Sequence, residues 1–275
     1  MMKIRKLTGH IGAELLDVDL TKDLTPTLIA DMRQALLDNL VIFFREQTLS
    51  PEQQIHFAEC FGEISRSPVY RTLEAYPKIM PVVKESTDKD IIGDTWHTDE
   101  TFQATPPLGS LLYAREIPPL GGDTLFANLY MAYDRLSDAL KTQLSGMRAI
   151  HSNDFLSTNA QLRNATRSTK LREDIGKINT SHPVVRTHEE TGRKLLFVNQ
   201  PFTYCFEGMT REESLPLLQY LYQQSSKPEL TCRFRWGPGS MAFWDNRCTM
   251  HYAINDYPGH RREMHRITVQ GSVPV

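Results

Sequence analysis

The sequence lacks the features of several common protein classes. Its 31 basic and 33 acidic side chains nearly cancel, which leaves a formal charge of −2. Nucleic-acid-binding domains normally carry a basic excess that neutralises phosphates, and membrane-surface proteins carry polybasic clusters, so we expect neither kind of partner. No apolar run approaches the roughly 20 residues that cross a bilayer.

Cysteine is scarce and scattered. None of the four cysteines forms a CxxC pair, so we expect neither a zinc ribbon nor a redox dithiol. We interpret all four as buried or half-buried small apolar side chains. The stretch from Met1 to Leu7 is charged and has no long apolar segment behind it, unlike a secretory signal. We therefore expect a cytoplasmic protein, whose thiols stay reduced. The cysteines are Cys60, Cys205, Cys232 and Cys248.

Internal repeats and low-complexity tracts are also missing, so we predict a single domain over residues 1–275. A cap at Thr25-Pro26 and apolar residues every four positions up to Leu40 predict a first helix. A capping box at Ser50–Gln53 predicts a second helix that ends at Gly62. Further patterns predict helices over 129–144 and from about 214 to 222.

Most of the remaining chain is typical of strands and loops. Short apolar runs predict strands over 41–44, 241–244 and 266–269, and residues 183–188 and 194–198 predict a hairpin. The fold class we expect is mainly β with flanking α, arranged as a sandwich core. Residues 152–180 are polar and have no clear period, so we interpret them as a mobile excursion that acts as a lid.

The tetrapeptide Trp96–Asp99 contains a pair of candidate metal ligands. On a strand, His97 and Asp99 would share a face and reach one ion. Adding a distant histidine would complete the two-histidine, one-carboxylate triad of non-haem iron oxygenases. His251 follows an apolar run and is one of the histidines available. A second such pair, His188 and Glu190, falls in the hairpin loop, where we expect it to be solvated.

A cluster of arginines follows His251. An arginine fork can bind a carboxylate through two hydrogen bonds. The alternative interpretation is that these arginines form a basic surface exposed to solvent. Arg262 and Arg266 are four residues apart and directly precede the apolar run at Ile267–Val269. We therefore predict that both enter a strand and share its inner face.

Ten segments, spread over almost the whole chain, give this sequence a family resemblance. Their order and spacing resemble those of the taurine dioxygenase and dichlorophenoxyacetate dioxygenase family of Fe(II)/α-ketoglutarate-dependent oxygenases. The segments are Ile11–Ala13, Val41–Arg45, Phe61–Glu63, Trp96–Asp99, Gly121–Thr124, His182–Val185, Phe197–Asn199, Trp244–Arg247, His251–Ala253 and Met264–Arg266.

The resemblance implies a double-stranded β-helix, or cupin-like jelly roll, as the core. It implies His97, Asp99 and His251 as ligands of Fe(II). It also implies that Thr124 and Arg262 bind the cosubstrate α-ketoglutarate, with Arg262 at the distal carboxylate. In this family, oxidative decarboxylation of α-ketoglutarate to succinate and CO₂ accompanies hydroxylation of the substrate by O₂. Homo-oligomers are common in the family, so we expect one here.

The same resemblance also implies which residues contact the substrate. Arg266 matches the arginine that binds the taurine sulfonate. Tyr70 and Phe202 also match substrate positions, although ordinary core packing would equally place them inside. Ser67 and Gly93 replace a histidine and an asparagine of the taurine enzymes.

These two replacements remove polar contacts and enlarge the pocket. We therefore expect a small anionic organic substrate that is larger or less polar than taurine. An alkyl sulfonate, an alkyl sulfate ester and an aryloxyalkanoate are the candidates, and taurine itself stays possible.

Two other classes of protein would use the same three ligands. A zinc hydrolase would activate a metal-bound water and would need neither Arg262 nor oxygen. A non-catalytic metal-binding β-sandwich would bind the ion without turnover. Iron- and oxygen-dependent formation of succinate separates the three hypotheses.

Overall fold

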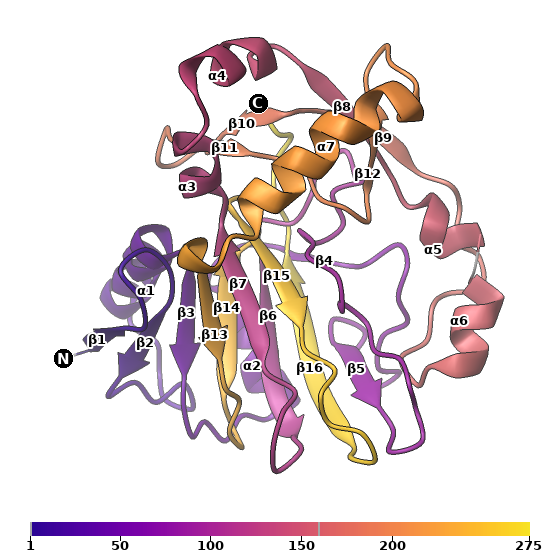
Figure 1. Ribbon diagram of the computed structural model, residues 1–275. Coiled ribbons are helices and arrows are strands. Elements are labelled where there is room, and N and C mark those ends of the chain that lie inside the picture. Colours follow the sequence, from indigo (N-terminus) through magenta and orange to yellow (C-terminus); the bar gives the residue numbers. More distant parts are fainter. Residues whose placement is uncertain (1, 159) are drawn as a thin grey trace.

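The computed structural model describes residues 2–158 and 160–275, and its fold is mostly β with several helices (Figure 1). The largest sheet has the strand order β1-β2-β3-β14-β6-β16-β4, and β5 pairs with β16. Every pairing in it is antiparallel except that of β2 with β3. The strand bounds are β1 (Lys3–Lys6), β2 (Ala13–Leu16), β3 (Val41–Phe44), β4 (Ile64–Ser65), β5 (Met80–Lys84), β6 (Gly109–Glu116), β14 (Met241–Asp245) and β16 (Arg262–Val269).

Three smaller antiparallel sheets accompany the large one. Their orders are β13-β7-β15, β12-β8-β9 and β10-β11. Their strand bounds are β7 (Thr124–Asn128), β8 (Arg148–Ser152), β9 (Asn179–Pro183), β10 (Val185–Thr187), β11 (Lys194–Leu196), β12 (Thr203–Phe206), β13 (Thr231–Phe234) and β15 (Thr249–Ala253).

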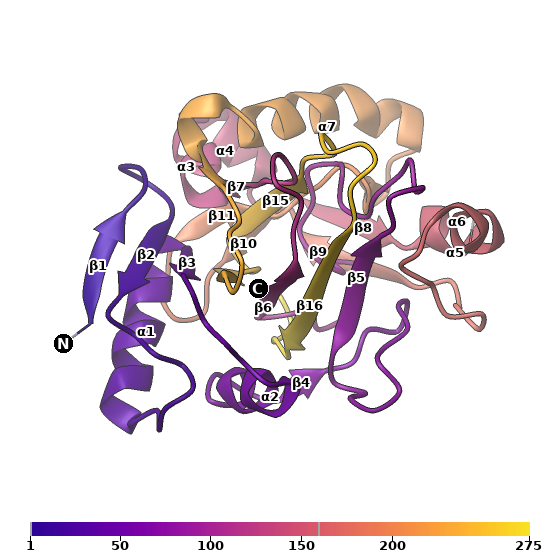
Figure 2. The same ribbon diagram turned by 90° about the horizontal axis from the view of Figure 1, so that it is seen from below.

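The helices lie around these sheets. Figures 1 and 2 show α5 and α6 on the side of the molecule opposite α1. No helix in the described part of the chain has both the length and the apolar character needed to span a membrane. The helix bounds are α1 (Pro26–Asn39), α2 (Pro51–Glu59), α3 (Leu129–Asp134), α4 (Asp138–Leu144), α5 (Asp154–Thr158), α6 (Ala160–Thr166), α7 (Arg211–Ser225) and the 3₁₀ helix η1 (Pro228–Leu230).

Alternation along the strands divides the core into layers. In β3, Phe43 stacks on Phe234 of the small sheet, with ring centroids 4.0 Å apart. Its neighbour Phe44 points the other way and packs edge-on against Phe57 of α2. Because successive side chains of a strand face opposite sides, one face of the large sheet meets the β13-β7-β15 sheet and the other meets α1 and α2.

Strand β16 follows the same rule and positions the arginines. Met264 belongs to the core between the sheets, whereas Ile267 belongs to the core beneath α1 and α2. Arg262 and Arg266 have the same parity as Met264 and line one cavity between the sheets. The prediction that both arginines enter a strand and share its inner face is confirmed.

Several predictions of local structure are also confirmed. The Thr25 side chain accepts a hydrogen bond from the Leu28 backbone and begins α1. Ser50 and Gln53 form the expected capping box at the start of α2. The hairpin forms between β10 and β11, and β3 is buried throughout. All four cysteines are free thiols, and three of them are buried.

Three expectations need correction. The helix predicted over 129–144 is divided into α3, which ends at Asp134, and α4, because the backbone is extended at Ser137 and the Ser137 hydroxyl caps the start of α4. Helix α7 begins before the predicted position, because Thr210 and Glu213 form a capping box at its start. Pro216 lies inside the helix and does not mark its beginning. The excursion over 152–180 contains α5 and α6 rather than irregular chain, and its residue 159 lies outside the described residues.

Of the pair His188 and Glu190, which was expected to be solvated, Glu190 is exposed but His188 is not. His188 is fully buried, and its Nε2–H donates to the Asp245 carboxylate at 3.0 Å. Arg247 binds the same carboxylate through two nitrogens and reaches Glu190 at 2.6 Å. Cys248 lies close enough to His188 and Asp245 for a shared metal ion. Arg247 already occupies that carboxylate, so this group acts as a buried charge network.

We predict that Asp245→Asn destabilises the fold by about 3 kcal/mol, because it leaves a buried guanidinium without its main counter-charge. Denaturant unfolding at neutral pH measures this. Burial alone would raise the pKa of Asp245, but Arg247 outweighs burial and holds the pKa below its ordinary value of 3.8. The ionised Asp245 therefore stabilises the folded state above pH 3.8, its ordinary pKa. This stabilisation is lost as the pH falls through the lower pKa that Asp245 has in the folded protein.

The variant should accordingly lose less stability on acidification than the parent. Asp174→Asn is the matched control, because Asp174 pairs with Arg172 at the exposed surface, and it should unfold like the parent. Equal stability of Asp245→Asn and the parent would contradict the account.

Candidate metal centre and substrate cavity

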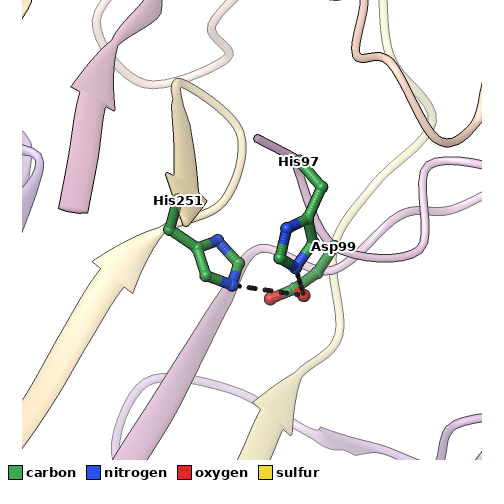
Figure 3. A group of neighbouring side chains, drawn as sticks. All are labelled: His97, Asp99 and His251. Atoms are coloured by element: carbon green, nitrogen blue, oxygen red, sulfur yellow. Dashed lines mark ion pairs between the residues drawn. The ribbon is translucent and has the colours of Figure 1, made fainter. Parts of the chain in front are cut away.

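His97, Asp99 and His251 converge between the sheets (Figure 3). The Nε2 atoms of the two histidines lie 3.6 and 3.7 Å from Oδ1 of Asp99. One ligand atom from each residue lies within 4.8 Å of the others, close enough to hold a metal ion. Two imidazoles and one carboxylate fit Fe(II) and leave positions open for further ligands.

The backbone places these residues by a different route from the one expected. The prediction of a regular strand over His97 and Asp99 is wrong. His97 forms an isolated bridge with His251, with hydrogen bonds of 3.0 and 2.8 Å in the two directions. The chain then turns at Asp99, whose backbone N–H donates to the Asn246 side chain. The Asn246 amide donates back to the Asp99 carbonyl, so the turn is fixed from both sides.

The protonation states suit metal binding, which requires neutral imidazoles and an ionised carboxylate. Burial lowers the pKa of both histidines. The His97 Nδ1–H donates to the Thr95 carbonyl at 2.7 Å, which directs the Nε2 lone pair toward the shared centre. Burial would raise the pKa of Asp99, but Arg266 and the two histidines outweigh it and lower the value to about 2.

Arg266 pairs with the carboxylate oxygen on the far side of Asp99. Its Nη2 lies 2.8 Å from Oδ2, and the Ser110 hydroxyl donates to the same oxygen at 2.9 Å. These contacts leave Oδ1 facing the histidines. The Arg266 Nε is buried and has no hydrogen-bond partner among the described residues, so one donor of this guanidinium stays available to a ligand.

A cavity beside the triad is lined by Arg262, Arg266, Thr124 and His251. Arg262 is 6% exposed, and its Nε and Nη2 have no partner among the described residues. Its guanidinium lies 5.7 Å from the Trp236 ring centre, and Trp236 donates to the Thr124 hydroxyl at 3.0 Å. A buried guanidinium without acceptors is costly, and a bound carboxylate would supply them.

A second, outer cavity reaches His97 from the other side. Tyr70, Phe202 and Gly93, three of the expected substrate residues, line this outer cavity. Gly93 also lines the first cavity, which we call the inner cavity. Gly93 has φ of +86°, and a Cβ there would lie 3.1 Å from Cε1 of His97. Glycine at this position therefore leaves room for the His97 ring.

Ser67 lines neither of these two cavities. Its hydroxyl donates to the buried Glu100 carboxylate and accepts from the backbone of Tyr70 at 3.2 Å. The Gln103 amide donates to the other oxygen of Glu100 at 2.6 Å. Ser67 thus fixes the turn that carries Tyr70.

Sequence reasoning missed the four residues that the excursion over 152–180 contributes to the outer cavity. They are Phe155, Leu156, Arg163 and Arg167. Phe155 packs against Phe202, with ring centroids 5.7 Å apart. The excursion showed no period, and only its expected position as a lid pointed toward the site. A lone Phe-Leu pair and two arginines carry no pattern that separates them from solvated residues.

A triad of this composition, next to a buried arginine that lacks an acceptor, defines a metal-dependent oxygenase that takes a carboxylate cosubstrate. Comparison with known proteins agrees. Residues 3–268 match the family model "Taurine catabolism dioxygenase TauD, TfdA family", and the chain belongs to this family. It is an Fe(II)/α-ketoglutarate-dependent dioxygenase, with O₂ as the second cosubstrate.

Individual relatives extend over nearly the whole chain. An alkylsulfatase of Acinetobacter baylyi is 35% identical over 99% of this chain and 86% of its own length. An α-ketoglutarate-dependent sulfate ester dioxygenase of Pseudomonas putida is 34% identical over 100% of this chain and 91% of its own. The crystal structure of a taurine dioxygenase from Burkholderia xenovorans is 37% identical with a TM-score of 0.84, covering 100% of this chain and 92% of that one.

We predict that Asp99→Ala and His251→Ala each weaken Fe(II) binding by at least about tenfold, because each removes a direct ligand. Anaerobic calorimetric titration measures the affinity, and circular dichroism checks that the variants are folded. His56→Ala on the exposed face of α2 is the control and should bind like the parent. Parent-like affinity in both ligand variants would place the metal elsewhere.

Proposed function

We propose that this dioxygenase hydroxylates an alkyl sulfate ester, with Fe(II) held by His97, Asp99 and His251. The observation that carries the proposal is the inner cavity, which joins His251 to two buried arginines with unused donors. One arginine serves the cosubstrate and the other the substrate. We also propose that the large sheet and the β13-β7-β15 sheet form the double-stranded β-helix of the family.

The α-ketoglutarate site is built around Arg262. We assign the distal carboxylate of the cosubstrate to its unpartnered Nε and Nη2, with the Thr124 hydroxyl beside it. When bound, iron and the keto acid supply the oxidising power that breaks a C–H bond. The protein needs no side chain as acid or base for that step, so its own task is to orient both molecules and exclude water.

The substrate anion is assigned to Arg266. Its Nη2 is held by Asp99 while its Nε stays free, so an anion bound there lies next to the metal ligand. Apolar side chains also line the neighbouring outer cavity, where Phe202 packs on Phe102 and Phe155. An anionic head with an apolar tail fits this division, and two of the relatives are named alkylsulfatase and sulfate ester dioxygenase.

The expected reaction balances without a further reagent. One atom of O₂ enters succinate as α-ketoglutarate loses CO₂. The other forms a hydroxyl on the carbon that carries the ester oxygen. That product is a hemiacetal ester, whose C–O bond to sulfate breaks to give an aldehyde and hydrogen sulfate. Succinate, aldehyde and sulfate should therefore form in equal amounts.

The proposal also includes the oligomeric state, the cellular location and the role of the excursion over 152–180. The family resemblance favours a homo-oligomer, which light scattering after size-exclusion chromatography tests. The four free thiols support a cytoplasmic location. The excursion over 152–180 contributes side chains to the outer cavity, which supports its role as a lid over a single dioxygenase domain.

We predict that Arg262→Lys raises the KM for α-ketoglutarate by about tenfold or more, because a lysine ammonium cannot bind a carboxylate as a two-pronged fork. Initial rates of succinate formation measure it. The control is Arg261→Lys, since Arg261 pairs with Glu85 and Glu263 outside the cavity, and its KM should not change. A KM equal to the parent's in Arg262→Lys would remove Arg262 from the cosubstrate site.

We predict iron-, oxygen- and α-ketoglutarate-dependent release of sulfate from hexyl sulfate, in a panel that also contains hexanesulfonate, phenoxyacetate and taurine. Arg266→Ala should raise the KM for the ester by about tenfold or more, because a charged hydrogen bond is lost. Fe(II) affinity is measured in parallel, since Arg266 also binds Asp99. An unchanged KM for every active anion would contradict the role of Arg266, and absence of sulfate would contradict the ester.

A further inference from the structure

The proposed function leaves two basic residues of the outer cavity without a role. Arg163 lies in α6, and Arg167 directly follows Thr166, the last residue of that helix. Both line the outer cavity, which His97 also lines. Two guanidinium groups therefore lie in the wall of the cavity that contains the metal ligand His97.

Neither guanidinium group forms an ion pair among the described residues, because no carboxylate oxygen lies within 4.0 Å of its nitrogens. The carboxylates of Asp94 and Asp90 act on Arg163 only from a longer distance. The Nε atoms of both are buried and have no hydrogen-bond partner in that part of the chain. Arg163 instead lies over the Phe155 ring, 4.9 Å from its centre. Arg163 and Arg167 are half-buried, and neighbouring cations repel each other, so an anion between them would stabilise both.

Tyr70 connects this pair to the metal centre. Its hydroxyl interacts electrostatically with Arg266 and Asp99 and also with Arg163. Tyr70 and Phe202 line the outer cavity together with the two arginines, and Gly93 and His97 line both this cavity and the inner cavity of Arg266. A molecule whose first anionic group binds Arg266 can therefore extend past these rings toward Arg163 and Arg167.

Hydrogen bonds to β5 and to the segment before Tyr70 anchor the part of the chain that follows the two arginines. The Thr169 hydroxyl accepts from the Val83 backbone of β5 at 2.7 Å. The backbone N–H of Arg172 donates to the Val69 carbonyl at 2.8 Å, next to Tyr70. The pair is therefore placed over the cavity by the sheet.

We propose that Arg163 and Arg167 form a second anion site, which binds a terminal carboxylate at the end of the substrate remote from the sulfate ester. The substrate class is then an alkyl sulfate with an anionic second end. This inference rests on the proposed function, because it places the first end of the molecule at Arg266.

The test compares alkyl sulfates with and without a terminal carboxylate, over a series of chain lengths, by sulfate release from the iron-loaded enzyme. We expect one chain length at which the carboxylated ester has a kcat/KM about tenfold or more above that of the plain ester, since each charge-assisted hydrogen bond contributes strongly. Arg163→Met and Arg167→Met keep the apolar stem, and each should reduce this preference toward unity. Arg163→Lys should restore part of it.

Two controls separate the site from a structural role. Arg172→Met changes an exposed arginine of the same segment, which pairs with Asp174, and should keep the preference. Asp94 also lines the outer cavity and is an alternative partner for Arg163. Asp94→Asn should keep or increase the preference, because it removes a competing carboxylate.

The outcomes distinguish the two proposals. Release of sulfate from plain esters, with no preference for a carboxylated ester at any length, would overturn the second anion site and leave the proposed function standing. A preference equal to the parent's in both Arg163→Met and Arg167→Met would also overturn the site, because neither guanidinium would then bind the carboxylate. Release of sulfate from neither series would overturn the proposed function itself.

Discussion

The ion pair between Asp99 and Arg266 is the interaction on which the rest of the site depends. It uses one carboxylate oxygen of Asp99, so that the other faces His97 and His251. It also holds a guanidinium beside the metal ligands, where an anionic substrate can bind. Burial alone would favour a protonated Asp99, and the arginine with both histidines reverses that preference. The candidate metal site and the proposed substrate site therefore share a single ion pair.

Around that ion pair, the two facing sheets supply further residues of the site, because alternate side chains of each strand point into the space between the sheets. Arg262 and Arg266 share the inner face of β16. His251 on β15 lies directly across from Phe126 on β7, in a strand pair that also carries Thr124. Register and parity fix the positions of these strand residues. The outer cavity is different, since it also takes side chains from the 152–180 excursion.

The sequence was informative where function follows local pattern or family motif. Period and capping residues predicted α1, α2 and β16, and the family motifs predicted every member of the triad. The wrong details are those set by distant contacts. A regular strand at His97 was a reasonable expectation, but the bridge to His251 and the clamp by Asn246 determine that backbone. Buried His188 looked solvated because Asp245 lies 57 positions away. The two cavity arginines carried no local signal at all.

The central claim is that one cavity holds Fe(II) at the triad and α-ketoglutarate at Arg262 together. Anaerobic titration of α-ketoglutarate into the Fe(II)-loaded protein, followed by visible absorption, tests it most directly. Chelation of Fe(II) by the keto acid produces a charge-transfer band. The account predicts a band that saturates at one equivalent per chain and is absent when Asp99 is replaced by alanine. Tight binding of Fe(II) with no such band at any α-ketoglutarate concentration would contradict the account.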